Sequence, residues 1–129
     1  MNALALKHVL AIAAGGAAGS VLRYGLSTLV HSFSGREFPY GTMAVNVLGC
    51  LLMGFLFVLL VERLSSDSVV RAALLIGVLG GFTTFSSFSI ETFNLIEDGL
   101  WLKAALNAAG SLILCLGATW IGVAAARAI

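Results

Sequence analysis

The chain has 129 residues, of which 60% are hydrophobic and only 10% are charged. A soluble domain normally carries about 25% charged residues, so this composition excludes an ordinary water-soluble domain and indicates a protein embedded in lipid. The net charge of +1 and the lack of a basic cluster exclude a nucleic-acid-binding surface.

Four segments are long and apolar enough to cross a bilayer, which requires about 20 residues each. They span about residues 7–30, 41–61, 70–95 and 100–126. Lys7 and His8 begin the first segment and precede its apolar part as in a signal peptide, but three further spans follow, so we expect the first to be retained as a helix. The short connections leave no room for a soluble or nucleotide-binding domain. We therefore expect one all-α, multi-pass transmembrane domain that is not an enzyme.

Small residues recur at spacings that allow helices to approach closely in a membrane. The spacings are Gly15-x-x-x-Gly19, Gly77-x-x-x-Gly81, and Gly49 with Gly110. We expect tight helix packing, and a bundle this small to complete itself by oligomerising.

The positive charges give the chain little preference for one orientation. With four spans, both termini and the middle connection share one side of the membrane. That side would hold Lys7, Arg63, Arg71 and Arg127. The opposite side would hold Arg36 and Lys103, and Arg23 would lie nearer to this second side. Because cytoplasmic loops normally carry the excess of positive charge, this slight bias suggests that the protein inserts both ways and pairs as an antiparallel dimer.

The second span contains two polar residues on one face, Thr42 and Asn46, at positions i and i+4. An asparagine amide in a membrane often bridges two helices. The alternative is that Asn46 donates hydrogen bonds into a permeation path. Both interpretations stay open at the level of sequence.

The third span contains the segment GGFTTFSSFS followed by Ile90 and Glu91. On a continuous helix, Phe82, Phe85 and Phe88 would form an aromatic ridge. A neighbouring polar stripe would contain Thr84, Ser87 and Glu91, with Ser86 and Ser89 beside the ridge. Plain packing of the rings, and hydroxyls bonded to their own helix, are the alternatives.

The glycine pair Gly80–Gly81, followed by Thr83–Thr84, is poor helix material. A break here would free backbone groups at membrane depth, which is tolerated where they meet protein, water or an ion. The sequence thus predicts a third helix broken in mid-membrane, with a simple kink as the alternative.

Neutral hydrogen-bond donors dominate the membrane spans, whose only carboxylate is Glu91. These donors are Thr42, Asn46, Ser86, Ser87, Asn107 and Ser111. Phenylalanine rings have positive edges, which Phe85 and Phe88 could offer to an anion. The pattern indicates a buried anion pathway without naming the anion.

The two cysteines, Cys50 and Cys115, lie inside apolar runs. We expect small buried hydrophobic side chains there, rather than a disulfide or a metal-binding pair.

Taken together, these motifs resemble the Fluc family of fluoride channels. The resemblance covers essentially the whole chain. It rests on the segment from Gly80 to Glu91, Gly41-Thr42-x-x-x-Asn46, Gly19-x-x-x-Arg23, and Asn107-x-x-Gly110-Ser111. It implies an antiparallel, dual-topology homodimer with two pathways. It also implies passive export of cytoplasmic fluoride across the bacterial plasma (inner) membrane.

The resemblance also implies roles for individual residues. The pore phenylalanines match Phe85 and Phe88, and the pore asparagine matches Asn46. A structural sodium ion at the dimer centre would be held by the backbone carbonyls of Gly80 and Thr83. The other matched pathway positions are Arg23, Thr42, Ser86, Ser87, Glu91, Asn107 and Ser111. The departures are Ser87 in place of threonine, a variable position at Asn107, and Cys115 where some members carry a hydroxyl.

Three further interpretations remain. Arg23 could instead extend its charged end to the membrane interface. A small multidrug-resistance-type exporter would share the four helices and dual topology, but it would need an acid in the first span, which contains none. A membrane assembly subunit without transport would leave the polar stripe unexplained.

Overall fold

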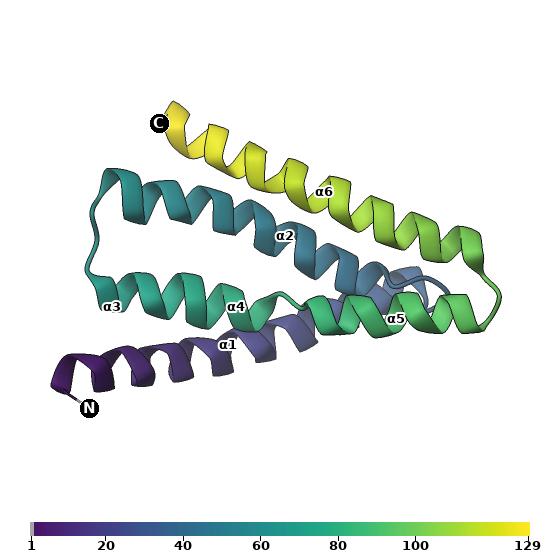
Figure 1. The fold of residues 1–129 in the computed structure, drawn as a ribbon, viewed down its shortest axis with the longest axis horizontal. Helices are drawn as coiled ribbons and strands as arrows, with labels where there is room; N and C mark the ends of the chain where they lie inside the picture. The colour runs from purple at the N-terminus through teal and green to yellow at the C-terminus, as the bar shows by residue number, and fades with distance from the viewer. Residues whose placement is uncertain (1) are drawn as a thin grey trace.

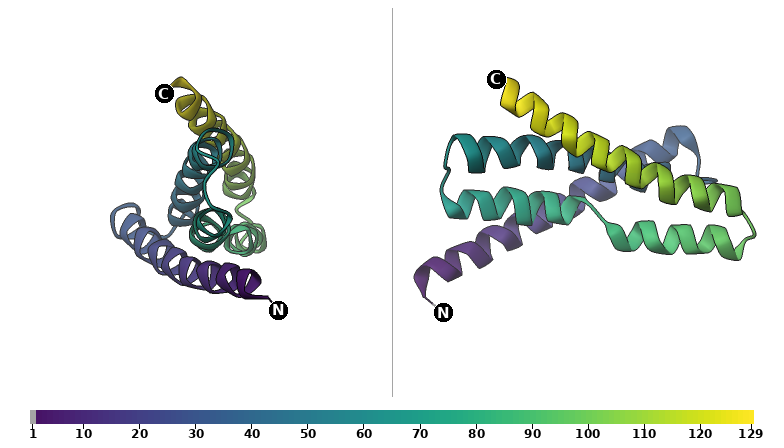
Figure 2. Two further views of the ribbon diagram at one scale, coloured as in Figure 1. Left: turned by 90° about the vertical axis from the view of Figure 1, so that its left-hand side faces the viewer. Right: turned by 45° about the horizontal axis from the view of Figure 1, so that its top comes forward.

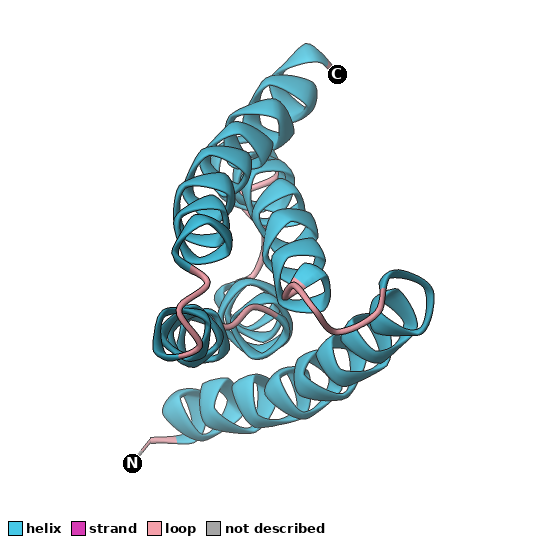
Figure 3. Cartoon of the chain, turned by 90° about the vertical axis from the view of Figure 1, so that its right-hand side faces the viewer, coloured by secondary structure: helices cyan, strands magenta, loops and turns pink. Residues whose placement is uncertain are grey.

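The computed structural model describes residues 2–129, and within that range it is helical apart from short connections (Figures 1 and 3). The first span is α1 (Ala3–Ser34). The second joins α2 (Tyr40–Phe57) to a wider helical turn, η1 (Val58–Arg63). The third contains α3 (Ser68–Arg71), η2 (Ala72–Leu79), α4 (Gly80–Phe82) and α5 (Phe85–Glu97), and the fourth is α6 (Trp101–Ala128). Four helices long and apolar enough to cross a membrane are present, as expected.

Local hydrogen bonds and glycines set the helix ends. The side-chain oxygen of Asn2 accepts the Ala5 N–H at 2.8 Å and starts α1. Gly35 and Gly99 have φ angles of 74° and 73°, which favour glycine, and they follow the ends of α1 and α5. Both termini and the connection at 64–67 lie at one end of the molecule, and the other two connections lie at the opposite end (Figures 1 and 2).

The helices approach one another through glycines. Helix α1 crosses η2 and α4 (Figure 2), where a Cβ atom on Gly19 would overlap the carbonyl oxygen of Val78, and one on Gly81 would lie 2.6 Å from the carbonyl oxygen of Gly16. The close approach predicted for the Gly15 and Gly77 motifs is therefore confirmed. Gly110 is different, because a Cβ atom there would meet only the Met43 methyl, at 3.6 Å.

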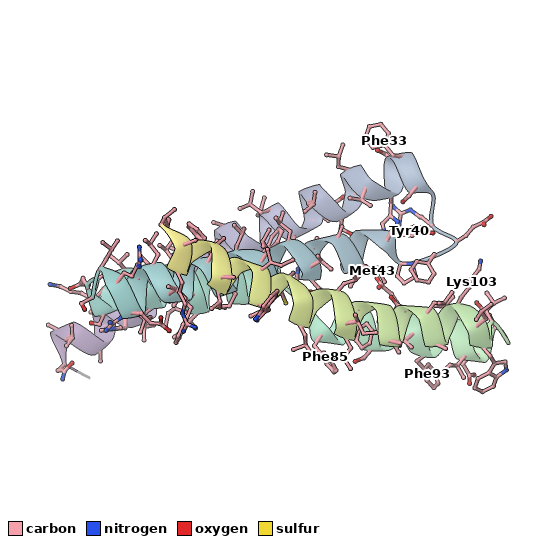
Figure 4. All side chains as sticks on the ribbon, turned by 90° about the horizontal axis from the view of Figure 1, so that it is seen from above. Phe33, Tyr40, Met43, Phe85, Phe93 and Lys103 are labelled. Carbon is pink, nitrogen blue, oxygen red and sulfur yellow. The ribbon has the colours of Figure 1, made fainter. Side chains whose placement is uncertain are left out.

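The bundle buries little and exposes much apolar surface, as Figure 4 shows for all described side chains. Val45 and Val58 are among the few large side chains that are fully buried. Leu112, Ile113 and Trp120 on α6 are all more than half exposed. Such a surface suits contact with lipid or with a second copy of the chain.

Candidate functional site

The centre of the site is the interruption of the third span at Thr83 and Thr84, visible as a stretch of loop between α4 and α5 (Figure 1). Both residues have extended backbone, with φ and ψ of −82° and 157° for Thr83 and −151° and 116° for Thr84. The helix is therefore interrupted at these two residues, and the depth of the interruption in the membrane stays a prediction. The interruption lies about midway along the span Ser68–Glu97.

The side chain of Asn46 on α2 holds this interruption in place. Its Oδ1 accepts the backbone N–H of Thr84 at 2.8 Å, and its Nδ2 donates to the carbonyl of Thr84 at 2.9 Å. The Thr84 hydroxyl oxygen accepts the N–H of Ser87 at 3.1 Å and so caps α5. Asn46 is thus an interhelical bridge, and one proton of its amide nitrogen stays available for another partner.

The interruption frees two backbone carbonyls, that of Gly80 on α4 and that of Thr83 directly after it. In a continuous helix the carbonyl of Gly80 would accept the Thr84 N–H, which Asn46 binds instead. The carbonyl of Thr83 would accept the Ser87 N–H, which the Thr84 hydroxyl binds instead. Within residues 2–129 neither carbonyl has a hydrogen-bond donor. Neutral oxygen ligands of this kind suit hard cations, so they fit the sodium ion that the resemblance implies.

A cavity of about 520 Å³ lies on one side of the interruption; we call it the phenylalanine cavity. The rings of Phe85 and Phe88 have their centroids 5.3 Å apart and are tilted by 49°. The lining of the phenylalanine cavity is formed by Asn46, Gly49, Cys50, Met53, Thr83, Thr84, Phe85, Phe88, Ser111, Leu112, Cys115 and Leu116. The side chain of Phe85 is 78% exposed and points away from α1 (Figure 4). One chain therefore forms only part of the cavity wall.

The prediction that Phe82, Phe85 and Phe88 form one aromatic ridge is wrong. Phe82 is only 6% exposed and belongs to α4, whereas Phe85 begins α5. The extended backbone between them changes the direction in which the following side chains point, so i+3 spacing does not continue across the interruption. Only Phe85 and Phe88 share a face.

A second cavity, of about 460 Å³, is predominantly polar; we call it the polar cavity. It is lined by Ser20, Arg23, Tyr24, Ser27, Thr28, His31, Arg36, Thr42, Val45, Thr84, Ser87 and Glu91. The Thr42 hydroxyl donates to Glu91 Oε1 at 2.8 Å, while Glu91 Oε2 is buried and has no hydrogen-bond partner among the described residues. Arg23 and Arg36 make the cavity attractive to anions.

A third cavity, of about 420 Å³, lies at the end of the bundle that holds the connections at 35–39 and 98–100. It shares His31, Arg36 and Glu91 with the polar cavity, and the polar cavity shares Thr84 with the phenylalanine cavity. The three cavities therefore form a row that leads from one end of the bundle to the interruption.

Most of the predicted site residues lie along this row. Arg23, Thr42, Ser87 and Glu91 line the polar cavity, and Asn46, Thr83, Phe85, Phe88 and Ser111 line the phenylalanine cavity. Gly80 and Ser86 are exposed beside the interruption. The Ser86 hydroxyl lies 3.3 Å from that of Thr84.

Asn107 lies outside all three cavities. Its side chain is 2% exposed and donates to the Thr92 hydroxyl at 2.8 Å, which joins α6 to α5. Its Oδ1 accepts from Ser111 at 3.4 Å. In a single chain Asn107 therefore acts as a buried bridge, and its place on a pathway remains a prediction.

Sequence reasoning identified Arg23 but missed the rest of the polar face of α1. The other residues of this face in the polar cavity are Ser20, Tyr24, Ser27, Thr28 and His31. Their spacing of three or four residues is the helical repeat of an amphipathic face, so a period analysis of the first span would have found them.

The expectation for the cysteines is also wrong in part. Cys50 and Cys115 are free thiols, but both are partly exposed rather than buried, and both line the phenylalanine cavity.

Comparison with known proteins identifies relatives over almost the whole chain. Residues 10–123 match the family model described as CrcB-like protein, Camphor Resistance (CrcB). The chain is 54% identical over 121 residues to "Fluoride-specific ion channel FluC" of Coxiella burnetii (strain Dugway 5J108-111), covering 93% of this chain and 98% of the relative. Proteins of the same name in Methylococcus capsulatus and Geobacter sulfurreducens are 50% and 49% identical. These two matches cover 91% and 95% of this chain, and 51% and 98% of the relatives.

The bridge from Asn46 predicts a specific loss of stability. Replacing Asn46 with alanine should lower the free energy of unfolding by about 1–3 kcal/mol, because the Thr84 N–H and carbonyl lose their partners in a water-poor region. Thermal unfolding of the purified protein in detergent measures this loss. Asn94→Ala is the control, since Asn94 is exposed and on α5. Equal melting temperatures for the two variants would contradict the bridge.

Proposed function

The chain belongs to the CrcB-like protein family, and from this membership we propose that it is a fluoride-selective channel that lets cytoplasmic fluoride leave the cell passively. It is a multi-pass integral membrane protein of the bacterial inner membrane and is not an enzyme. The observation that carries the proposal is the identity of about half of all positions, over nearly the full length, with channels named as fluoride-specific.

The row of cavities supplies a route that suits a small anion. Arg23 and Arg36 would raise the local anion concentration in the polar cavity. Further in, fluoride would exchange its water for neutral donors, namely the free amide proton of Asn46 and the hydroxyl of Ser87. The Ser111 hydroxyl donates to Asn107 Oδ1, and this hydrogen bond would have to switch before Ser111 could serve the anion. Binding by neutral groups stays weak enough for the ion to move on.

The Thr42 hydroxyl has a single proton, which it donates to Glu91. For Thr42 to serve a passing anion, this hydrogen bond must switch. The aromatic part of the route would then use the ring edges of Phe85 and Phe88. Chloride would be excluded because the larger ion does not fit between closely spaced donors and rings.

The biological need follows from acid–base chemistry. Hydrogen fluoride crosses membranes in its neutral form and ionises in a neutral cytoplasm. The trapped anion then requires a path out, and a passive channel provides one.

Two copies of the chain, in opposite orientations, would complete the site. The outward-facing Phe85 and the exposed Gly80 leave the region of the interruption open on one side, which a second copy would cover. The freed carbonyls of Gly80 and Thr83 in both copies would hold a structural sodium ion. Such an ion would supply positive charge near the pathway and hold the two interruptions together.

The alternative of a proton-coupled cation exporter is disfavoured by α1. The segment Ala3–Ser34 contains no aspartate or glutamate on which coupled cation export could depend. Fluoride efflux from liposomes that requires no proton gradient would distinguish the channel from this alternative, and from a subunit that transports nothing.

The ring edges predict a flux defect without an assembly defect. Phe85→Ile and Phe88→Ile should each lower fluoride efflux from liposomes about tenfold, which corresponds to a loss of about 1.4 kcal/mol of anion stabilisation. Phe93→Ile is the matched control, because Phe93 lies on the same helix, is 53% exposed and lines none of the three cavities. Normal efflux in both pathway variants would show that the two rings serve packing and not conduction.

Sodium removal should reduce the same efflux several-fold. Proteoliposomes prepared with all sodium replaced by a large organic cation are compared before and after sodium is added back. Recovery with sodium, and not with added organic cation, is expected if the freed carbonyls bind the ion. Full activity without sodium argues against the structural ion.

The antiparallel arrangement predicts two orientations in the membrane. A cleavable reporter on the C-terminus should be accessible from each side of the membrane in about half of the molecules, because an antiparallel dimer contains one copy in each orientation. A reporter accessible from one side alone would rule out this arrangement.

A further inference from the structure

The helices α2 and α6 lie side by side and run in the same direction (Figure 1). Their register is fixed at two points. The side chain of Arg127 pairs with Glu62 at 3.0 Å, and a Cβ atom on Gly54 would overlap the carbonyl oxygen of Thr119. Each pair is separated by 65 positions in the sequence. Cys50 and Cys115 have the same separation, so the register places them opposite each other.

The register therefore places the two thiols on facing helices beside the same cavity. Both are free, partly exposed and part of the wall of the phenylalanine cavity. Met53 lies three residues after Cys50 on α2 and lines the same cavity. These are the only two cysteines in the chain.

Sulfur ligands select soft metal ions. Thiolates and thioethers favour copper(I) and similar ions over hard cations. Zinc normally takes four ligands in a structural site. Within residues 2–129, however, no group of three or more histidine, cysteine, aspartate or glutamate residues could hold a metal. A monovalent ion of the copper(I) and silver(I) class needs only two sulfur ligands, with the thioether as a third.

We propose that Cys50, Cys115 and Met53 form a binding site for a soft monovalent cation of this class, and that its occupation blocks the ion pathway. The site follows from the register of α2 and α6 and from the residues that line the cavity, whereas the block rests on the proposed channel function. Loss of one thiol proton on binding leaves a neutral complex, and loss of both leaves a complex with a net charge of −1. Either complex fills space beside Phe85 and Phe88, and the charged one also repels an anion.

The binding test uses silver nitrate and the purified protein in chloride-free detergent solution. One silver ion per chain should protect both thiols from a maleimide reagent. Cys50→Ser and Cys115→Ser should each weaken silver binding at least tenfold, with unchanged elution on size exclusion as the check on folding. Protection of one thiol per silver ion, or silver affinity that neither variant lowers, would overturn the site.

The role of the Met53 thioether is tested with a matched pair of methionine variants. Met53→Leu should weaken silver binding several-fold, whereas Met43→Leu should not, because Met43 packs near Gly110 and lines none of the cavities. Equal silver affinity in the two methionine variants would remove Met53 from the site.

The block is measured as fluoride efflux from liposomes, with each variant normalised to its own rate without silver. Wild-type efflux should fall at the silver concentration that saturates thiol protection, and the Cys50→Ser/Cys115→Ser double variant should resist. Bound silver with unchanged efflux would overturn the block. Absence of efflux before silver is added would instead refute the channel function, and thiol protection would still decide the binding site.

Discussion

The pair of hydrogen bonds between the Asn46 amide and the backbone of Thr84 is the constraint on which the rest of the site depends. A helix interrupted in hydrocarbon leaves N–H and C=O groups that lipid cannot satisfy. Asn46 satisfies both groups of Thr84, and the Thr84 hydroxyl then caps α5 through Ser87. Because these groups find partners within the protein, the chain can change direction at this point. The change of direction points Phe85 outward. It also leaves the backbone carbonyls of Gly80 and Thr83 without hydrogen-bond donors.

The close approach of α1 determines what faces the interruption from the other side. Apolar side chains gain little by leaving lipid for another helix, so backbone contact through small residues drives packing in membranes. Gly19 and Gly81 provide that contact between α1 and the third span. Arg23 lies one helical turn beyond Gly19, and it therefore enters the same cavity as Thr84. The glycine contact therefore also positions the polar face of α1 beside the interruption.

Local patterns in the sequence were sufficient for the four apolar helices, because hydropathy is a property of short segments. The assumption of a continuous helix gave a wrong position for Phe82, since an extended pair of residues resets the helical repeat. The pairing of Cys50 with Cys115 has a different origin. It depends on the register of two helices that are 65 positions apart in sequence, and no local pattern encodes that register. In the proposed dimer, a second copy would cover Phe85, and no local pattern in the sequence encodes such a contact.

The distribution of charge along the row of cavities fits the proposed conduction of an anion. Arg23 and Arg36 lie in the polar cavity, whereas the phenylalanine cavity has no charged residue in its lining. A fixed cation in the phenylalanine cavity would bind fluoride tightly and slow its exit, so neutral donors and ring edges suit that region better. The same lack of fixed charge makes the inner cavity sensitive to any ion that binds there. In a low-dielectric region a single added charge acts strongly on its surroundings, and Cys50 and Cys115 are the side chains in that lining best able to acquire one.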